Sequence, residues 1–274
     1  MDVFPVDWVA ADVTRGETAQ YCVSVFGKTP EGKSACVHID FFPYFYVEFP
    51  DAWTPGRQKL WISETCSKYG ALPGYSRPVQ RVPMWGFTGS RAKAFAQLAF
   101  PTLRAFKSAR YKLQQEFQTY EASVDPVVRL FHVRGIKPAQ WIHVARSTPV
   151  PGESEPATTC EVEVSCVFTD VAPSSLTARP PLVLASWDIE VYSESGKFPL
   201  SDNPGDCIIQ IATTFQRYGE ESPYLRTVVA LDTVDDVDGV EIVAVAHEHD
   251  VVNSWVDLMR REAADVLIGY NTHQ

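Results

Sequence analysis

The sequence lacks the features of a membrane-spanning or secreted protein. No apolar run approaches the roughly 18 residues that a membrane helix needs, and the first seven residues contain neither a basic start nor an apolar stretch. Six cysteines are scattered without any CxxC pair, which argues against a dense disulfide framework and a zinc knuckle. We therefore expect a soluble, non-secreted protein with no membrane partner, whose thiols are reduced and mostly buried.

The composition also excludes a disordered or low-complexity chain. Hydrophobic residues make up 45% of the 274 residues and aromatic residues 12%, which is enough for one large core or two medium ones. The formal net charge of -10 argues at first against a polyanionic partner, because phosphate binding normally requires an excess of Lys and Arg.

The charge is distributed unevenly along the chain. Residues 65–115 contain nine basic residues and no Asp or Glu, whereas residues 182–274 contain 17 acidic and five basic residues. The basic stretch is interleaved with aromatic residues, as in surfaces that follow a nucleic-acid backbone, but a solvated helix face explains it equally well. Its candidate DNA contacts are Arg104, Lys107 and Arg110.

Segments rich in Pro, Ser, Thr and Gly place a domain boundary near residues 172–181. We predict a mixed α and β domain over residues 1–175 and an α/β domain with a mixed sheet over residues 176–274. In the first domain we predict strands at 21–26, 34–47, 94–100 and 160–168, and helices at 102–113 and 126–135. In the second we predict strands at 182–190, 207–213, 226–231, 241–246 and 266–270, and a helix from Asp250 to about Glu262.

Asp188 and Glu190 form the most informative pair of acidic residues. They end the nearly continuous apolar segment 182–190, which is typical of a strand covered on both faces, and side chains two apart on a strand share a face. Adjacent carboxylates repel each other unless a cation neutralises them, and a bound Mg²⁺ or Mn²⁺ can activate water for attack on phosphorus. Spacing alone equally allows two solvated carboxylates beyond a buried strand.

Residues 27–34, Gly-Lys-Thr-Pro-Glu-Gly-Lys-Ser, match the P-loop pattern letter for letter. A P-loop must lead directly into a helix, whose N-terminal amides face the phosphates. The residues that follow, 35–42, are rich in β-branched and aromatic side chains and predict a strand. We therefore interpret this match as a hairpin turn and not as a nucleotide site.

Four stretches, taken in order, resemble the amino-terminal part of family B DNA polymerases, most closely the eukaryotic delta type and its relatives in large DNA viruses. Residues 42–47 resemble an early aromatic strand, and residues 120–125 with 141–142 resemble the segment before the nuclease domain. Trp-Asp-Ile-Glu at 187–190, followed by 196–199 and 206–211, resembles the first exonuclease motif. Ile-Gly-Tyr-Asn at 268–271 resembles the opening of the second.

This resemblance implies an α/β and α+β architecture: a mixed amino-terminal domain followed by a ribonuclease H-like 3'→5' exonuclease domain that proofreads for a DNA-directed DNA polymerase. Asp188 and Glu190 would be the catalytic carboxylates; Asp188 would bridge two divalent ions, Mg²⁺ or Mn²⁺, and Glu190 would bind one and help orient the attacking water. Asn271 would contact substrate. The implied partners are primer-template DNA and its single-stranded 3' end, deoxynucleotides, and accessory subunits or a sliding clamp, in the nucleus or at a viral replication site.

The sequence also departs from the family pattern. The second motif normally continues through three residues to Phe-Asp, whereas this sequence stops at residues 272–274, and the third motif and the polymerase signatures are absent. We therefore expect a fragment of a larger enzyme with an incomplete exonuclease domain, inactive by itself. Two alternatives stay open: a stand-alone 3'→5' exonuclease and a non-catalytic nucleic-acid-binding module.

Overall fold

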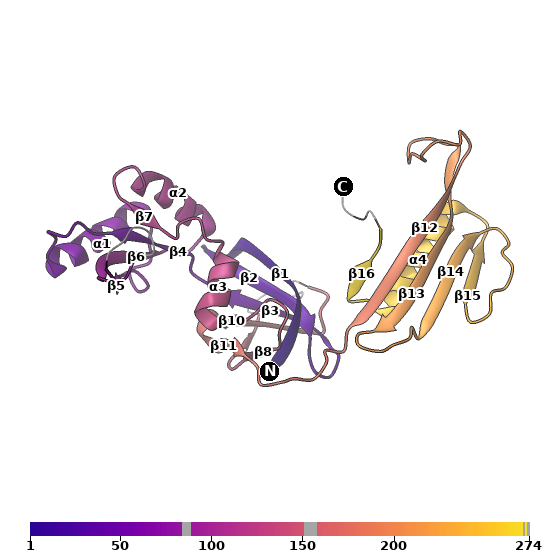
Figure 1. The fold of residues 1–274 in the computed structure, drawn as a ribbon, viewed down its shortest axis with the longest axis horizontal. Helices are drawn as coiled ribbons and strands as arrows, with labels where there is room; N and C mark the ends of the chain where they lie inside the picture. Colours follow the sequence, from indigo (N-terminus) through magenta and orange to yellow (C-terminus); the bar gives the residue numbers. More distant parts are fainter. Residues whose placement is uncertain (84–88, 151–157, 271, 273–274) are drawn as a thin grey trace. The chain divides into compact units, whose positions relative to one another are not determined.

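The computed structural model describes residues 1–83, 89–150, 158–270 and 272, which divide into two compact units. The first unit comprises Met1–Thr29 and Lys33–Leu176, and the second comprises Pro30–Gly32 and Thr177–Gln274. Two β-sheets lie in the first unit and one in the second (Figure 1). No described helix is both long enough and apolar enough to cross a membrane.

A seven-stranded sheet, ordered β11-β8-β1-β2-β3-β10-β9, forms one core of the first unit. Its elements are β1 (Asp2–Arg15), β2 (Thr18–Lys28), β3 (Ser34–Asp40), β8 (Ile142–Val144), β9 (Thr148–Pro149), β10 (Val162–Val167) and β11 (Val171–Pro173), with α3 (Pro126–Arg134) and a short 3-10 helix (Phe168–Asp170). β3 and β10 run parallel, and the other neighbouring strands run antiparallel. Val23, Val25, Val37 and Ile39 are fully buried on one face of this sheet, in one cluster with Leu130 of α3.

The second sheet of this unit, ordered β5-β6-β4-β7, shares an aromatic core with two helices. Its elements are β4 (Tyr44–Glu48), β5 (Arg77–Arg81), β6 (Lys93–Ala99), β7 (Thr119–Tyr120), α1 (Pro55–Tyr69) and α2 (Leu103–Leu113). Phe45 of β4 stacks on Phe100 with ring centroids 5.5 Å apart, and it meets the edge of Phe106 of α2 at 5.4 Å. Each such aromatic pair adds about 1 kcal/mol to the stability that comes from burial alone.

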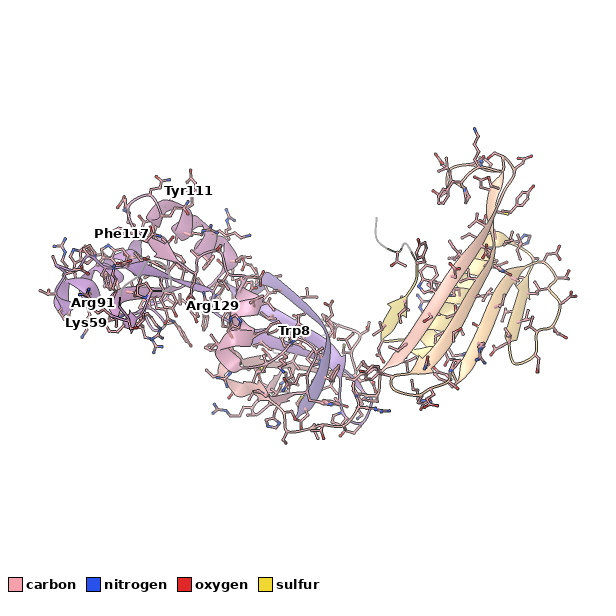
Figure 2. All side chains as sticks on the ribbon, viewed as in Figure 1. Trp8, Lys59, Arg91, Tyr111, Phe117 and Arg129 are labelled. Carbon is pink, nitrogen blue, oxygen red and sulfur yellow. The ribbon has the colours of Figure 1, made fainter. Side chains whose placement is uncertain are left out.

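Arg129 connects α3 to the aromatic strand β4 (Figure 2). Its guanidinium lies 4.7 Å from the ring centre of Tyr44 and forms an ion pair with Glu121, although Arg129 is buried. Burial of a charge is costly, and here the carboxylate and the aromatic face offset that cost. Two of the segments that carry the family resemblance, residues 42–47 and 120–125, are therefore held together by one arginine.

The second unit is a five-stranded mixed sheet, ordered β15-β14-β13-β12-β16, with one helix on one face. Its elements are β12 (Val183–Ser193), β13 (Asp206–Arg217), β14 (Leu225–Leu231), β15 (Glu241–Val245), β16 (Val266–Ile268) and α4 (Glu248–Glu262). β12, β13 and β14 are antiparallel neighbours, whereas β15 and β16 each run parallel to their partner. Ala185, Ile211, Phe215 and Val229 of the sheet are buried in clusters that include Val251 and other apolar residues of α4. The predicted mixed sheet is confirmed.

Several predicted element boundaries are wrong, and two of them are informative. The strand predicted over residues 34–47 is divided, because β3 ends at Asp40 and β4 begins at Tyr44 in a different sheet. Pro43 explains the break, since it has no N–H to donate and restricts the backbone of the residue before it. The helix predicted to start at Asp250 starts at Glu248, with His247 as its N-cap and Asp250 in its first turn.

β1 and α1 are among the elements that were not predicted from the sequence, although residues typical of a helix start and a helix end flank α1. Thr54 precedes Pro55 and caps the helix by accepting the backbone N–H of Arg57, and Gly70 ends the helix with a left-handed backbone. The same order of cap, proline and terminal glycine identified α3, where the residues are Asp125, Pro126 and Gly135.

Residues 27–34, which match the P-loop pattern, form the hairpin between β2 and β3. The backbone N–H of Thr29 donates to the carbonyl of Lys33 at 3.0 Å, and the Thr29 hydroxyl accepts the N–H of Lys33 at 3.3 Å. β3 follows at Ser34, so the helix that a P-loop requires is replaced by a strand. The interpretation of this segment as a hairpin turn is confirmed.

We predict that Gly27→Ala lowers the free energy of unfolding by about 2 kcal/mol, because it forces a backbone shift. A Cβ at Gly27 would lie 2.1 Å from the carbonyl oxygen of Phe4 in β1. Urea denaturation followed by circular dichroism measures the change. The control is Gly56→Ala in the first turn of α1, whose new methyl group meets nothing closer than 4.0 Å. Equal stability of the two variants would contradict the close approach of β1 and β2.

Candidate functional site

The alternation of side chains along β12 sets the position of Asp188 and Glu190. Trp187 faces α4, and its ring lies 5.0 Å from the ring of Trp255. Because successive side chains of a strand point to opposite faces, Asp188 and Glu190 lie together on the other face of the sheet. Both are exposed.

The face that carries these two carboxylates is open in the part of the chain that the structure describes. Ser186, Asp188 and Glu190 are exposed, whereas Ala185 between β13 and β16 is fully buried beneath α4. The expectation of a strand covered on both faces is therefore not met within the described residues. The alternation of buried and exposed positions is typical of an antiparallel strand with one covered face.

On the side of β16, the edge of β12 is also unpaired next to the two carboxylates within the described residues. Asp188 is the register partner of Ala212 in β13, and Glu190 is the register partner of Gln210. The register between β12 and β13 shifts immediately after Glu190. β16 pairs with β12 only over Leu184–Ser186, so its ladder ends before either carboxylate. A shifted register re-aims the side chains near it, and the small side chain of Ala212 leaves space beside Asp188.

This arrangement offers hard oxygen ligands suited to Mg²⁺ or Mn²⁺. Among the described residues, no third His, Cys, Asp or Glu joins Asp188 and Glu190 in a close group of three potential ligands. The described residues therefore offer two potential metal ligands on one face, Asp188 and Glu190.

Glu190 also lines a cavity of about 750 Å³ at the end of β12. The other lining residues come from the connection between β12 and β13, from the start of β13 and from the start of α4; they include Phe198, Leu200, Asp202, Asp206 and Glu248. Asp188 is not among the lining residues. Of the two carboxylates, only Glu190 therefore borders the cavity, which was not predicted from the sequence.

Two further carboxylates hold the wall of this cavity by binding backbone amides. Asp206 accepts the N–H of Leu200 at 2.9 Å, and this bond lowers the pKa of the Asp206 carboxyl below its ordinary value. Glu248 accepts the N–H of Ile208 at 2.7 Å. No local sequence pattern identifies either role, because each carboxylate acts on a segment that folds back onto it.

Arg104, Lys107 and Arg110 lie on α2 in the first unit and therefore in a different unit from Asp188 and Glu190. Arg104 and Lys107 are exposed and Arg110 is half-buried, and none of the three forms an ion pair with another described residue. Tyr111, on the same helix, is 64% exposed (Figure 2). Asn271 lies outside the described residues.

The chain resembles known DNA polymerases over nearly its whole length. The family model described as DNA polymerase family B, exonuclease domain, matches residues 117–274. The DNA polymerase of Paramecium bursaria Chlorella virus NY2A is 44% identical over 272 residues, which cover 99% of this chain and 30% of the viral protein. The DNA polymerase delta catalytic subunit of Schizosaccharomyces pombe is 26% identical over 270 residues, covering 91% of this chain and 24% of the yeast protein.

The fold is also found in a solved structure. The family B DNA polymerase of the hyperthermophilic archaeon Pyrobaculum calidifontis matches with a TM-score of 0.64 at 20% sequence identity, covering 99% of this chain and 30% of that one. The chain therefore spans about 30% or less of the length of these three relatives.

The bond from Asp206 to Leu200 yields a prediction for the cavity wall. Asp206→Ala should accelerate hydrogen exchange of the Leu200 amide about tenfold, because a bond to a charged acceptor is lost. Asp202→Ala, which removes another carboxylate from the same cavity, is the matched control and should leave that amide unchanged. Exchange rates measured by NMR that are equal in wild type and Asp206→Ala would refute the role of Asp206.

The lowered pKa of Asp206 adds a prediction of pH dependence. A carboxyl whose pKa is lower in the folded chain stabilises the fold above its ordinary pKa and loses this contribution as the pH falls through the folded value. The Leu200 amide chemical shift should therefore stay constant from neutral pH to about pH 4 and change only below it. A titration midpoint near neutral pH would contradict this assignment.

Proposed function

The chain belongs to DNA polymerase family B, and on this basis we propose that it forms the amino-terminal part of a DNA-directed DNA polymerase with a 3'→5' proofreading exonuclease. The match to the exonuclease-domain family includes the whole of the second unit's sheet and α4. Because the chain spans about 30% or less of its relatives, polymerisation itself is assigned to the whole protein.

One observation carries the proposal for the exonuclease site: Asp188 and Glu190 lie on the open face of β12, inside the segment that matches the exonuclease family. Exonuclease domains of this family are metal-dependent. Asp188 is proposed to bridge two divalent ions, Mg²⁺ or Mn²⁺, and Glu190 to bind one of them and orient a water. Ions bound there would activate that water and stabilise the charge that develops on the scissile phosphate.

The surroundings of the pair support this role. The uncovered face gives a DNA strand end access to both carboxylates, and because β16 does not pair with β12 beyond Ser186, that edge of β12 is approachable within the described residues. The acidic residues concentrated in 182–274 attract cations before a phosphate arrives. Asn271 remains a proposed substrate contact.

The partners are proposed from the same family membership. The substrates are primer-template DNA, its single-stranded 3' end and deoxynucleotides, and the proposed place of action is the nucleus or a viral replication site. Accessory subunits or a sliding clamp are further proposed partners. The relatives support this proposal because they are named as viral DNA polymerases and as delta catalytic subunits.

A second candidate function, DNA binding by the first unit, is favoured by Arg104, Lys107 and Arg110 of α2. Arg104 and Lys107 project into solvent, and no described acidic side chain neutralises them in an ion pair. Cations of this kind contact a phosphate backbone without selecting a sequence. This function is compatible with a polymerase and also with a non-catalytic module.

In the polymerase that carries this chain, Asp188→Ala and Glu190→Ala should each reduce 3'→5' degradation of single-stranded DNA by at least about a hundredfold, because metal ligands are lost. Primer extension should be unchanged. The measurement is Mg²⁺-dependent release of nucleotides from a labelled 3' end. Asp235→Ala, which removes an exposed carboxylate from the connection between β14 and β15, is the control.

The outcomes of these assays test the proposed site at Asp188 and Glu190 separately from the proposed proofreading function. Wild-type degradation by Asp188→Ala would refute the site, whereas primer extension without any degradation by the wild type would refute proofreading. Residues 1–274 alone should not degrade DNA, because the described residues supply only two of the ligands. Degradation by these residues, lost in Asp188→Ala, would instead favour a stand-alone exonuclease.

For the basic helix, replacing Arg104, Lys107 and Arg110 together by Ala should weaken single-stranded DNA binding. The slope of the logarithm of affinity against the logarithm of salt concentration should fall by about 2, because three phosphate contacts are lost. Fluorescence anisotropy at several salt concentrations measures both effects. Asp188→Ala, assayed without divalent ions, is the control and should bind as the wild type does. An unchanged salt slope in the triple variant would exclude this helix as a DNA contact.

A further inference from the structure

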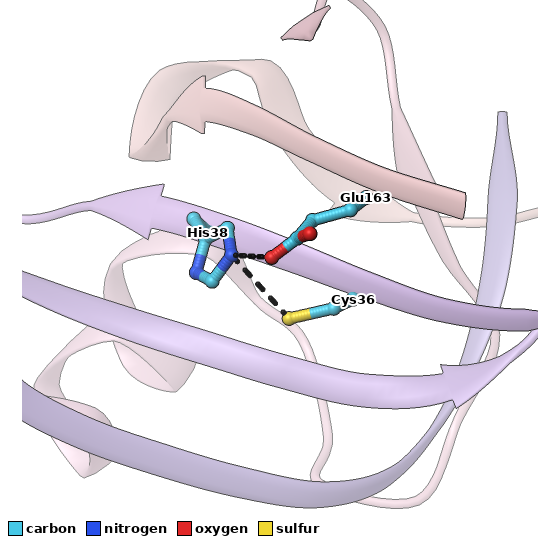
Figure 3. A group of neighbouring side chains, drawn as sticks. All are labelled: Cys36, His38 and Glu163. Atoms are coloured by element: carbon cyan, nitrogen blue, oxygen red, sulfur yellow. Dashed lines mark hydrogen bonds and ion pairs between the residues drawn. The ribbon is translucent and has the colours of Figure 1, made fainter. Parts of the chain in front are cut away.

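A polar cluster lies in the first unit, apart from the carboxylates of β12. Cys36 and His38 are two residues apart on β3 and share a face of the seven-stranded sheet, opposite the face that buries Val37 and Ile39. β3 and β10 run parallel, and Glu163 of β10 is the register partner of Cys36 (Figure 3). The three side chains therefore converge from two neighbouring strands.

The three side chains present one sulfur, one nitrogen and one oxygen to a common point. The Nε2 atom of His38 lies 2.8 Å from Oε1 of Glu163 and 3.6 Å from Sγ of Cys36. The three atoms all lie within 4.8 Å of one another. Figure 3 shows His38 joined by dashed lines to both Glu163 and Cys36.

These separations are close to those around a tetrahedral zinc ion. With ordinary Zn–N, Zn–S and Zn–O bond lengths, the ligand atoms stand roughly 3.5 Å apart for N and S and roughly 3.3 Å apart for N and O. The observed separation between His38 and Cys36 already fits. The Glu163 carboxylate has to move by about 0.5 Å, which rotation of its side chain provides.

The second nitrogen of His38 is held in the way that a metal-binding imidazole requires. Nδ1 lies 2.9 Å from the hydroxyl oxygen of Ser24 on β2. An imidazole that binds a metal through Nε2 carries its proton on Nδ1 and donates it to a neighbouring acceptor, which fixes the ring orientation. Ser24 is placed to accept that proton.

Burial and charge favour zinc over magnesium here. Cys36 is fully buried, and the side chains of His38 and Glu163 are only 13% and 8% exposed. A divalent ion with one thiolate, one carboxylate and a neutral imidazole forms a neutral unit, which reduces the cost of burying charge. Thiolate and imidazole ligands select zinc, whereas Mg²⁺ prefers oxygen ligands and retains its waters.

We propose that Cys36, His38 and Glu163 form a structural zinc site that joins β3 to β10. These residues supply three ligand atoms, and a water takes the fourth position. The site ties residues 125 apart along the chain and is independent of the function proposed for Asp188 and Glu190.

The test uses residues 1–274, freed of metal by a chelator and titrated with Co²⁺ as a spectroscopic substitute for Zn²⁺. One equivalent should bind with a thiolate-to-cobalt charge-transfer band and tetrahedral visible bands, and added Zn²⁺ should displace it. Cys36→Ser should abolish the charge-transfer band. Glu163→Gln, which is nearly isosteric, should retain the band and lower the affinity by at least about tenfold.

Cys166→Ser is the matched control, because Cys166 lies on β10 with its side chain in the hydrophobic core on the opposite face. It should bind Co²⁺ as the wild type does, and Zn²⁺ should raise the melting temperature of both but not of Cys36→Ser. Circular dichroism verifies that each variant is folded. If the wild type gives no charge-transfer band, or if the band and affinity persist unchanged in Glu163→Gln, the three residues are a hydrogen-bonded group and the proposal is wrong.

Discussion

The second unit depends on one constraint: a β-strand directs successive side chains to opposite faces of its sheet. In β12 this alternation directs Trp187 to α4 and the carboxylates of Asp188 and Glu190 to the open face. The packing of α4 holds the register, because Trp255 contacts Trp187 and donates its Nε1–H to the hydroxyl of Thr213 in β13 at 3.0 Å. A slip of one residue would bury the carboxylates and expose the tryptophan, so the same apolar contacts that stabilise the sheet also position the pair.

Basic and acidic residues are concentrated in different segments of the chain, so the net charge of -10 describes neither segment. The acidic residues are concentrated in 182–274, the segment that also carries the proposed metal site, where neighbouring carboxylates lower their mutual repulsion by binding cations. The basic residues of 65–115 lie in the other unit, and four of them belong to α2. A chain that binds both divalent cations and a polyanion needs both signs of charge, and this sequence carries them in separate segments.

Local sequence patterns predicted the second unit well and its cavity not at all. Apolar runs and caps are local signals, and they identified the five strands, α4 and the common face of Asp188 and Glu190. Where proline interrupts an apolar run, as at Pro43, the pattern continued while the strand did not. The cavity wall depends on Asp206 and Glu248 binding amides of segments that fold back onto them, and pairing of that kind has no local signature.

The same alternation produces both proposed metal sites, and their surroundings give them different chemistry. On β3, as on β12, two proposed ligand residues at alternate positions share a face, while the neighbouring side chains of Val37 on β3 and Trp187 on β12 pack in a core. The parallel neighbour β10 adds Glu163 to Cys36 and His38 and encloses them, whereas β16 ends before Asp188 and leaves that pair in solvent. A closed set with a sulfur ligand suits an ion that stays bound and stabilises the fold. An open pair of carboxylates suits ions that exchange and share their coordination with a substrate phosphate.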